Sequence, residues 1–209
     1  MHRRRALGIL GVSLTSPLAI AASAAAQAHP AAGPMPSAAA AAPQAPALHA
    51  PDPAPQQNDI EKYPRCSYCG MDRRRFHHSR MLIHYGDGTV DPLCSLRCAV
   101  NSLALHLGAV PVAIWVGDNA ATTDPLPLAD AEKATYLVRS SIRGVMTRRS
   151  KVAYSTADAA AKAMAASGGE IADFDKALAA AFGDVAESIS RYLKTNEERL
   201  KRIAKQGDR

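Results

Sequence analysis

The chain has 209 residues, 47% of them hydrophobic, and a formal net charge of +6 at neutral pH. This length accommodates one modest domain with extensions. Half of the net positive charge comes from Arg3, Arg4 and Arg5, so the balance in the rest of the chain is too small to indicate a nucleic-acid-binding protein.

Residues 1–28 are predicted to be a cleaved signal peptide. The three arginines precede an apolar run without charges, Ala6 to Ala26, and Ala26-Gln27-Ala28 offers the small-x-small pattern at which signal peptidase cuts. The run is rich in alanine and contains Pro17, which argues against a permanent membrane helix. We therefore expect export to the periplasm by the Sec or twin-arginine route. No cysteine lies near the cleavage point, so no lipid anchor is expected.

Residues 29–60 are rich in alanine and proline and contain few large apolar side chains. Such a segment cannot bury enough surface to offset the entropy that it would lose on ordering. We predict a flexible spacer here, with His29 and His49 in solvent. The folded domain is predicted to comprise residues 61–176, followed by a helical extension over residues 177–209.

The predicted domain begins with two strands, a helix and a third strand. The first two strands are expected over residues 80–85 and 89–93, because the Gly86-Asp87-Gly88 sequence between them tolerates the positive φ angles of a hairpin turn. Ser95 can cap a helix that runs to about Leu107. Residues 110–116 then form the third strand.

The same order of elements recurs further along the chain. Residues 135–139 and 152–155 are predicted strands, a helix follows over residues 157–166, and residues 170–172 form a short strand. This recurrence predicts an α+β fold made of two related strand-strand-helix-strand units. Apolar residues at helical spacing predict a C-terminal helical region from Phe174 to about Lys205, with a break near Gly183.

All four cysteines lie in the first unit as two close pairs, Cys66-x2-Cys69 and Cys94-x3-Cys98. A C-x2-C turn can aim two sulfur atoms at one centre, and residues four apart at the start of a helix share one face. The helix N-terminus and the neighbouring arginines are expected to favour the thiolate form.

Spacing alone leaves four interpretations of these cysteines open. A structural disulfide pair is natural in an oxidising compartment. Four thiolates can instead close a structural Zn(II) site in a module that mediates protein contacts. Thiolates and thioethers together can hold Cu(I). Finally, Cys66 and Cys69 can act as a thiol-disulfide redox pair.

Two methionines favour the Cu(I) interpretation. Met71 follows Cys69 across Gly70, so a thioether and a thiol can turn toward the same centre. Met146 lies in a predicted turn, Gly144-Val145-Met146-Thr147, where a buried side chain is not expected.

The order of these motifs resembles that of the NosL family, periplasmic copper-binding accessory proteins for the maturation of nitrous oxide reductase. The resemblance covers about residues 62–176. It rests on Cys66-Ser-Tyr-Cys-Gly-Met-Asp72, His78-Ser-Arg-Met-Leu82, Tyr85-Gly-Asp-Gly-Thr89, Leu93-Cys-Ser-Leu-Arg-Cys98 and Gly144-Val-Met-Thr147.

The resemblance implies a copper chaperone rather than an enzyme, with a two-lobed α+β fold that binds Cu(I) through sulfur. The partner that it implies is a copper acceptor, nitrous oxide reductase or its assembly machinery. Two adjacent histidines, His77 and His78, are further candidates as nitrogen ligands. The candidate sulfur ligands are Cys66, Cys69, Met71, Met146, Cys94 and Cys98. Of these, Cys94 and Cys98 resemble a treble-clef-like motif and could be either metal ligands or a structural pair.

Overall fold

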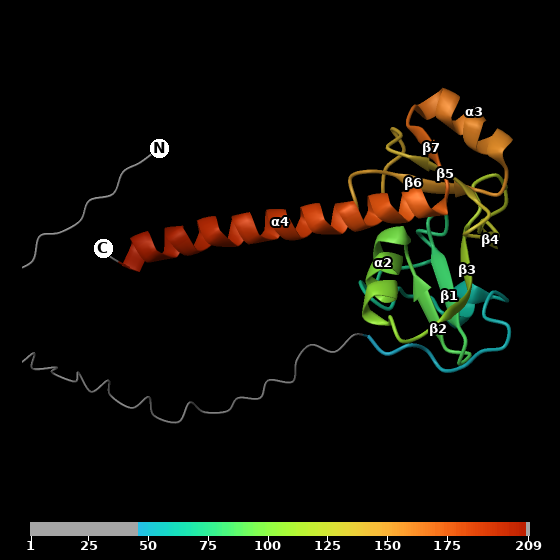
Figure 1. The fold of residues 1–209 in the computed structure, drawn as a ribbon, viewed down its shortest axis with the longest axis horizontal. Helices are drawn as coiled ribbons and strands as arrows, with labels where there is room; N and C mark the ends of the chain where they lie inside the picture. The colour runs from blue at the N-terminus through green and yellow to red at the C-terminus, as the bar shows by residue number, and fades with distance from the viewer. Residues whose placement is uncertain (1–45, 208–209) are drawn as a thin grey trace, which may run out of the picture. The chain divides into compact units, whose positions relative to one another are not determined.

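The computed structural model describes residues 46–207, so the predicted signal peptide lies outside the described range. Residues 46–207 form two antiparallel sheets and four helices (Figure 1). The strand order is β2-β1-β3-β4 in the first sheet and β6-β5-β7 in the second. The strands are β1 (Met81–Tyr85), β2 (Val90–Leu93), β3 (Pro111–Gly117), β4 (Leu128–Asp130), β5 (Thr135–Val138), β6 (Lys151–Tyr154) and β7 (Glu170–Ala172), and the helices are α1 (Asp59–Lys62), α2 (Leu96–Leu105), α3 (Ala157–Ser167) and α4 (Phe174–Gly207).

The two sheets repeat one arrangement. β1 lies between β2 and β3, just as β5 lies between β6 and β7, and every pair is antiparallel. Helices α2 and α3 each connect the second strand of a run to the third. The predicted α+β fold with two related strand-strand-helix-strand units is therefore confirmed. The structure adds β4, an edge strand of the first sheet that the sequence pattern does not predict.

Polar side chains cap two of the helices. The Thr156 hydroxyl accepts a hydrogen bond from the Ala159 N–H at 3.3 Å, and the Asp173 carboxylate accepts one from the Lys176 N–H at 2.9 Å. Ser95 occupies the N-cap position of α2, but its hydroxyl makes no capping bond. The Ser95 side chain faces the cysteine region instead, where the Cys94 thiol lies 3.8 Å from its oxygen.

Residues 46–60 belong to the predicted spacer, yet in the structure they lie against the first sheet. The His49 N–H donates to the Val90 oxygen at 2.8 Å, and the Val90 N–H donates back to the His49 oxygen at 3.3 Å. Asp59 and Ile60 are buried. The packed region therefore starts upstream of residue 61, the predicted boundary of the domain.

A buried cluster of three charges attaches this segment to the first sheet. The Asp59 carboxylate accepts hydrogen bonds from Arg73 at 2.8 Å and from Arg80 at 2.9 and 3.1 Å. The guanidinium groups also donate to backbone carbonyls, Arg73 to Tyr63 at 2.6 Å and Arg80 to Leu126 at 2.9 Å. This cluster orders a segment that is rich in alanine and proline. Local composition does not reveal it, because the two arginines lie further along the chain.

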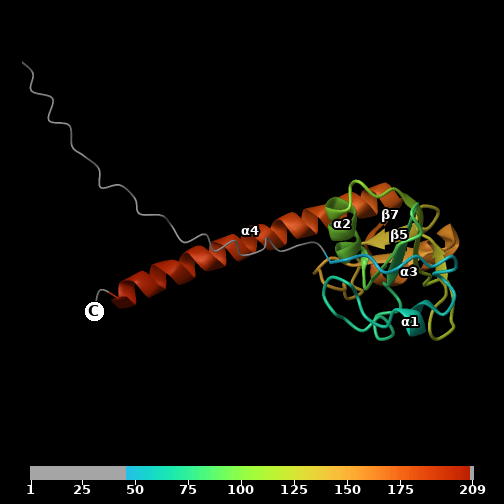
Figure 2. The ribbon, with the colours of Figure 1, turned by 90° about the horizontal axis from the view of Figure 1, so that it is seen from below.

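Helix α4 is continuous from Phe174 to Gly207, so the predicted break near Gly183 is wrong. One glycine costs a helix only about 1 kcal/mol relative to alanine, and the alanines at 179–181 are strong helix formers. Ala177, Ala181 and Asp184 are buried against the domain, whereas most side chains after Ser188 are exposed. In Figures 1 and 2 this exposed part extends beyond the sheets. Within residues 46–207, no helix combines the length and the apolar character needed to cross a bilayer.

The strand β2 contributes a buried carboxylate that gives folding a dependence on pH. Asp91 accepts a hydrogen bond from the Ser102 hydroxyl, while its second oxygen, Oδ1, has no partner among the described residues. Burial raises the pKa of Asp91 above its usual range. Stability from this group is therefore fully present below the ordinary carboxyl pKa and is lost as the pH rises through the raised value.

We expect Asp91→Asn to remove this loss, because an amide carries no charge to bury. The variant should be measurably more stable than the wild type at pH 8 and equally stable at pH 3.5. Urea unfolding at both pH values measures the difference. The exposed Asp87, whose pKa is lowered by hydrogen bonds from Thr89, provides the control, since Asp87→Asn should bring no gain. Parallel stability–pH curves for Asp91→Asn and wild type would contradict the expectation.

Candidate metal centre

The first cysteine pair lies in a tight turn that precedes β1. The Cys66 N–H donates to the Met71 oxygen and the Gly70 N–H donates to the Cys66 oxygen, both at 2.9 Å. Gly70 has a φ of 68°, a left-handed conformation that glycine adopts without a steric penalty. The turn therefore places Cys66 and Cys69 on one side and leads directly into Met71.

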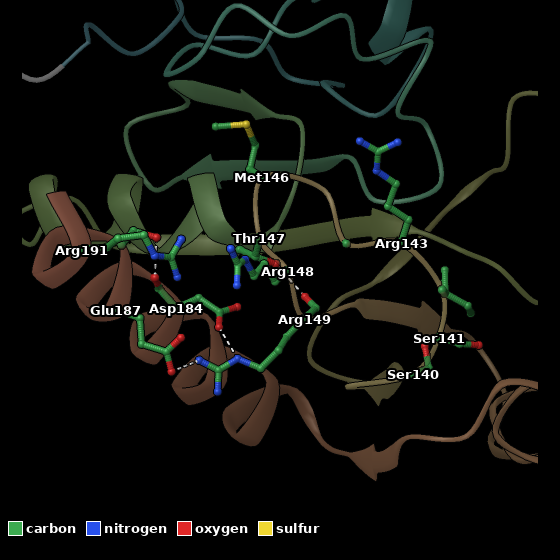
Figure 3. A pocket seen from close by; sticks show the side chains of 13 residues that line it. Ser140, Ser141, Arg143, Met146, Thr147, Arg148, Arg149, Asp184, Glu187 and Arg191 are labelled. Carbon is green, nitrogen blue, oxygen red and sulfur yellow. Dashed lines mark hydrogen bonds and ion pairs between the residues drawn. The ribbon is translucent and has the colours of Figure 1, made fainter. Parts of the chain in front are cut away.

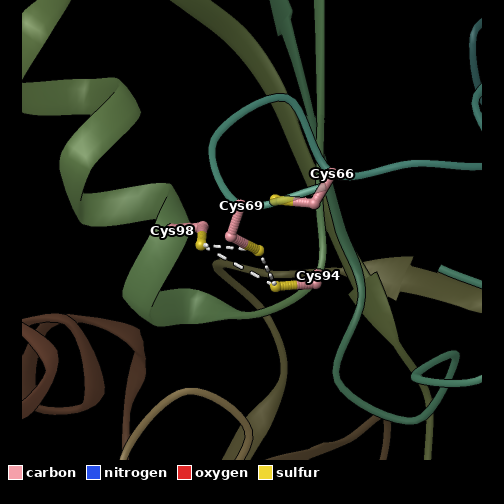
Figure 4. A group of neighbouring side chains, drawn as sticks. All are labelled: Cys66, Cys69, Cys94 and Cys98. Atoms are coloured by element: carbon pink, nitrogen blue, oxygen red, sulfur yellow. Dashed lines mark hydrogen bonds between the residues drawn. The ribbon is translucent and has the colours of Figure 1, made fainter. Parts of the chain in front are cut away.

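The second pair lies at the start of α2. Cys94 follows β2, and Cys98 lies in the first helical turn, where its N–H donates to the Ser95 oxygen at 3.0 Å. The spacing of four residues turns both thiols toward the loop that carries Cys66 and Cys69, as Figure 4 shows.

All four sulfur atoms lie within 4.8 Å of one another. The Sγ–Sγ distances are 3.4 Å from Cys69 to Cys94, 3.7 Å from Cys94 to Cys98 and 3.8 Å from Cys98 to Cys69. A tetrahedral ion with metal–sulfur bonds of about 2.3 Å holds its ligands about 3.8 Å apart. The four thiols are thus spaced to hold one tetrahedral metal ion.

The thiols differ in exposure and in acidity. Cys66, Cys94 and Cys98 are buried, whereas Cys69 is half-buried. Hydrogen bonds from Cys94 and then Cys98 lower the pKa of the Cys66 thiol. The same contacts with Cys66 raise the pKa of Cys94 and Cys98. Thiols this close to one another share their protons as a group, and an incoming metal ion displaces the protons that remain.

Met71 and Met146 come from distant parts of the sequence but line a common cavity of about 270 Å³. His78 lines the same cavity. Burial lowers the pKa of His78, and the neighbouring His77 lowers it further, so its imidazole is neutral at pH 7 and suited to ligate a metal. His77 is engaged elsewhere, since its Nδ1 accepts a hydrogen bond from the Leu126 N–H at 3.0 Å. The structure separates two histidines that the sequence leaves equivalent.

Met146 is held in a strained loop between β5 and β6. Its φ of 61° is uncommon for a residue with a side chain, and such strain persists only where the surroundings enforce it. The loop is packed closely around Gly144. A Cβ atom at this position would lie 2.5 Å from the Thr147 oxygen and 2.8 Å from the Arg149 oxygen, so only glycine fits there. The Met146 side chain is 42% exposed, so it can be reached from solvent.

Met146 also borders a second cavity, of about 660 Å³, in which arginine side chains gather (Figure 3). Of its four arginines, only Arg149 has acidic partners within residues 46–207; it pairs with Asp184 at 2.5 Å and with Glu187. Sequence analysis does not predict this cavity, because the arginines come from the β5–β6 loop and from α4. The remaining positive charges of the cavity belong to Arg143, Arg148 and Arg191.

These features define an α+β protein with a sulfur site for a metal ion. The chain belongs to the NosL family, which matches it over residues 57–182. The resemblance seen in the sequence motifs is thereby confirmed. The match ends near the start of α4, so most of that helix lies outside it.

Two solved structures are similar to this chain. The copper chaperone NosL from Shewanella denitrificans is 23% identical, with a TM-score of 0.46 over 53% of this chain and 87% of that one. The apo-NosL protein from Achromobacter cycloclastes is 28% identical, with a TM-score of 0.31 over 46% of this chain and 82% of that one. A comparison with curated proteins found no match.

Proposed function

We propose that this protein binds Cu(I) through sulfur and passes it to an acceptor protein. The proposal rests on the cavity that Met71 and Met146 both line. Met71 follows Cys69 of the thiol cluster by two residues, so one loop carries residues of both the cluster and the cavity. Thiolate and thioether ligands together select Cu(I) among the common metal ions. Membership of the NosL family supports the proposal.

The exposure of the ligands suggests how the ion is handed on. Cys69 is the least buried thiol, and Met146 is the more exposed of the two cavity methionines. An acceptor can replace such ligands one at a time, so Cu(I) need never be free in solution. In this proposal Cys66, Cys94 and Cys98 hold the ion from the buried side.

The proposed acceptor is nitrous oxide reductase or its assembly machinery, in the periplasm. The arginine-lined cavity next to Met146 offers a positive surface on which an acidic face of that acceptor can dock. The protein acts in this proposal as a carrier, and no catalytic step is assigned to it.

The spacing of the four thiols favours a second candidate, a structural Zn(II) site. Sulfur separations of 3.4–3.8 Å suit a closed tetrahedral Zn(II) ion with no open position. In that case the cluster stabilises the fold, and the methionines take no part in metal binding. The two candidates therefore differ in what Met71 and Met146 do.

We expect Met71→Ala and Met146→Ala each to weaken Cu(I) binding by about tenfold or more, the range found when a contact that supports a metal site is lost. Both variants should bind Zn(II) as tightly as the wild type, because Zn(II) has little affinity for thioethers. Competition between the reduced protein and a colorimetric chelator, for each ion in turn, measures these affinities.

Met164→Ala is the matched control, because Met164 is partly exposed on α3, outside both cavities. Copper-edge X-ray absorption of the loaded variants should show one sulfur neighbour fewer for Met71→Ala and for Met146→Ala. Unchanged Cu(I) affinity in both methionine variants, together with its loss in Cys69→Ser, would favour the closed four-thiolate site.

A further inference from the structure

Helix α4 carries an apolar stripe beyond the end of the NosL match. Four large side chains on it are exposed, Ile189 by 54%, Leu193 by 60%, Leu200 by 67% and Ile203 by 53%. They are spaced by four, seven and three residues, which fits the heptad pattern of a coiled-coil seam. The complete stripe is Phe182, Ala186, Ile189, Leu193, Asn196, Leu200 and Ile203.

We propose that this stripe is the seam of a parallel coiled coil between α4 of one copy of this chain and α4 of a second copy. A strict seven-residue repeat drifts by about 20° per heptad on a straight helix, so it stays in contact only with another helix that coils around it. The stripe is also narrow, two positions per heptad, whereas a helix that packs on a domain surface shows a wider apolar face. The inference is independent of the proposed function, because the stripe shares no residue with the metal site.

Asn196 indicates the orientation of the two helices. It lies in the middle of the stripe, between Leu193 and Leu200. In a parallel dimer in register, Asn196 faces Asn196 of the other copy, and each amide can donate to the other and accept from it. In an antiparallel dimer each asparagine would face an apolar side chain and remain unpaired in the seam. A single polar residue in the seam therefore favours one register of the two helices.

The residues beside the stripe are complementary in the same orientation. In a parallel pair, Tyr192 of one helix lies across from Glu197 of the other, five residues further on. The phenol hydroxyl can donate a hydrogen bond to that carboxylate, and the dimer contains this contact twice. Both side chains are exposed in the single chain.

A membrane surface fits the stripe less well than a second helix does. A helix that lies in a lipid headgroup layer has an uninterrupted apolar face with basic residues around it. Here Asn196 interrupts the apolar face, and Glu197 borders it directly. The polar side carries the acidic Glu198 together with six basic residues, so the vesicle measurement below tests the membrane directly. The basic residues are Arg191, Lys194, Arg199, Lys201, Arg202 and Lys205.

Sedimentation of the reduced protein between 1 and 100 μM tests the proposal, and we expect a dimer. Leu193→Asp with Leu200→Asp should weaken dimerisation at least 100-fold, because two charges would enter the seam of each helix. Lys194→Asp with Lys201→Asp is the matched control, since it introduces the same number of aspartates on the outer face and should leave the dimer intact. Far-UV circular dichroism and an unchanged count of reactive thiols show that the domain and α4 remain folded.

Cross-linking tests the orientation. Asn196→Cys should form a disulfide-linked dimer in oxidised glutathione, whereas Glu198→Cys, on the outer face, should not exceed the wild-type background. A wild-type protein that sediments as a monomer at 100 μM overturns the proposal, as does Asn196→Cys that fails to cross-link. Loss of binding to anionic phosphatidylglycerol vesicles by the Leu193→Asp/Leu200→Asp variant, with no change in mass, would assign the stripe to a membrane instead.

Discussion

Replacing Asp59 with asparagine is expected to lower the free energy of unfolding by about 3–5 kcal/mol, the range found when one partner of a buried ion cluster is removed. Asp59 is the only acidic group in hydrogen-bonding contact with Arg73 and Arg80 among the described residues, and both arginines are almost fully buried. The substitution would leave two guanidinium charges in a low-dielectric environment without a counterion. Unfolding in guanidinium chloride, monitored by circular dichroism, measures the change.

Asp124→Asn is the control for this prediction. Asp124 also binds an arginine, Arg74 at 3.2 Å, but its side chain is 73% exposed. Its loss should change stability far less, because exposed ion pairs contribute little. Adding Arg80→Met to Asp59→Asn should restore part of the stability by removing one of the two unpaired charges. Equal effects of Asp59→Asn and Asp124→Asn would mean that the cluster does not anchor the segment.

Replacing Cys94 with serine is expected to weaken metal binding by about 100-fold or more. Structural Zn(II) sites bind with roughly 10–16 kcal/mol, so the loss of one thiolate of four removes about 3 kcal/mol. Cys94 has two sulfur neighbours within 3.7 Å and is fully buried, so solvent cannot replace it. Isothermal titration of the reduced protein measures the change for Cu(I) and for Zn(II).

Met164→Ala is the control, because Met164 is partly exposed on α3, away from the thiol cluster. Binding by the wild type should also release protons and weaken with acidification, since Cys94 and Cys98 have a raised pKa and must lose their protons to bind. Titrations in buffers of different ionisation enthalpy give the number of protons. Unaltered affinity in Cys94→Ser would remove this thiol from the site.

The order of strands and helices could be predicted from the sequence because local signals mark their ends. The Gly86-Asp87-Gly88 turn, the Thr156 cap and the Gly168-Gly169 terminus all lie where local chemistry requires them. The convergence of the four thiols could be anticipated too, since each pair occupies a local turn or helix start that aims both sulfur atoms the same way.

Features that depend on contacts between distant residues could not be predicted in this way. The order of residues 46–60 depends on Asp59 reaching Arg73 and Arg80, and no local pattern encodes that contact. The different surroundings of His77 and His78 depend on a loop that contains Leu126. Helix α4 continues through Gly183 because the stability of the whole helix exceeds the cost of one glycine. A prediction from that glycine alone does not take the rest of the helix into account.

The two sheets share one arrangement but differ in the length of the connection between their first two strands. In the first sheet, residues 86–89 join β1 to β2; in the second, the equivalent connection between β5 and β6 spans residues 139–150 and carries Met146 together with most of the arginines around it. The ends of this connection are pinned by antiparallel pairing, so its interior is free to change length and composition without moving any thiol. The loop that carries Met146 can therefore vary in sequence while the four thiols of the first unit keep their geometry.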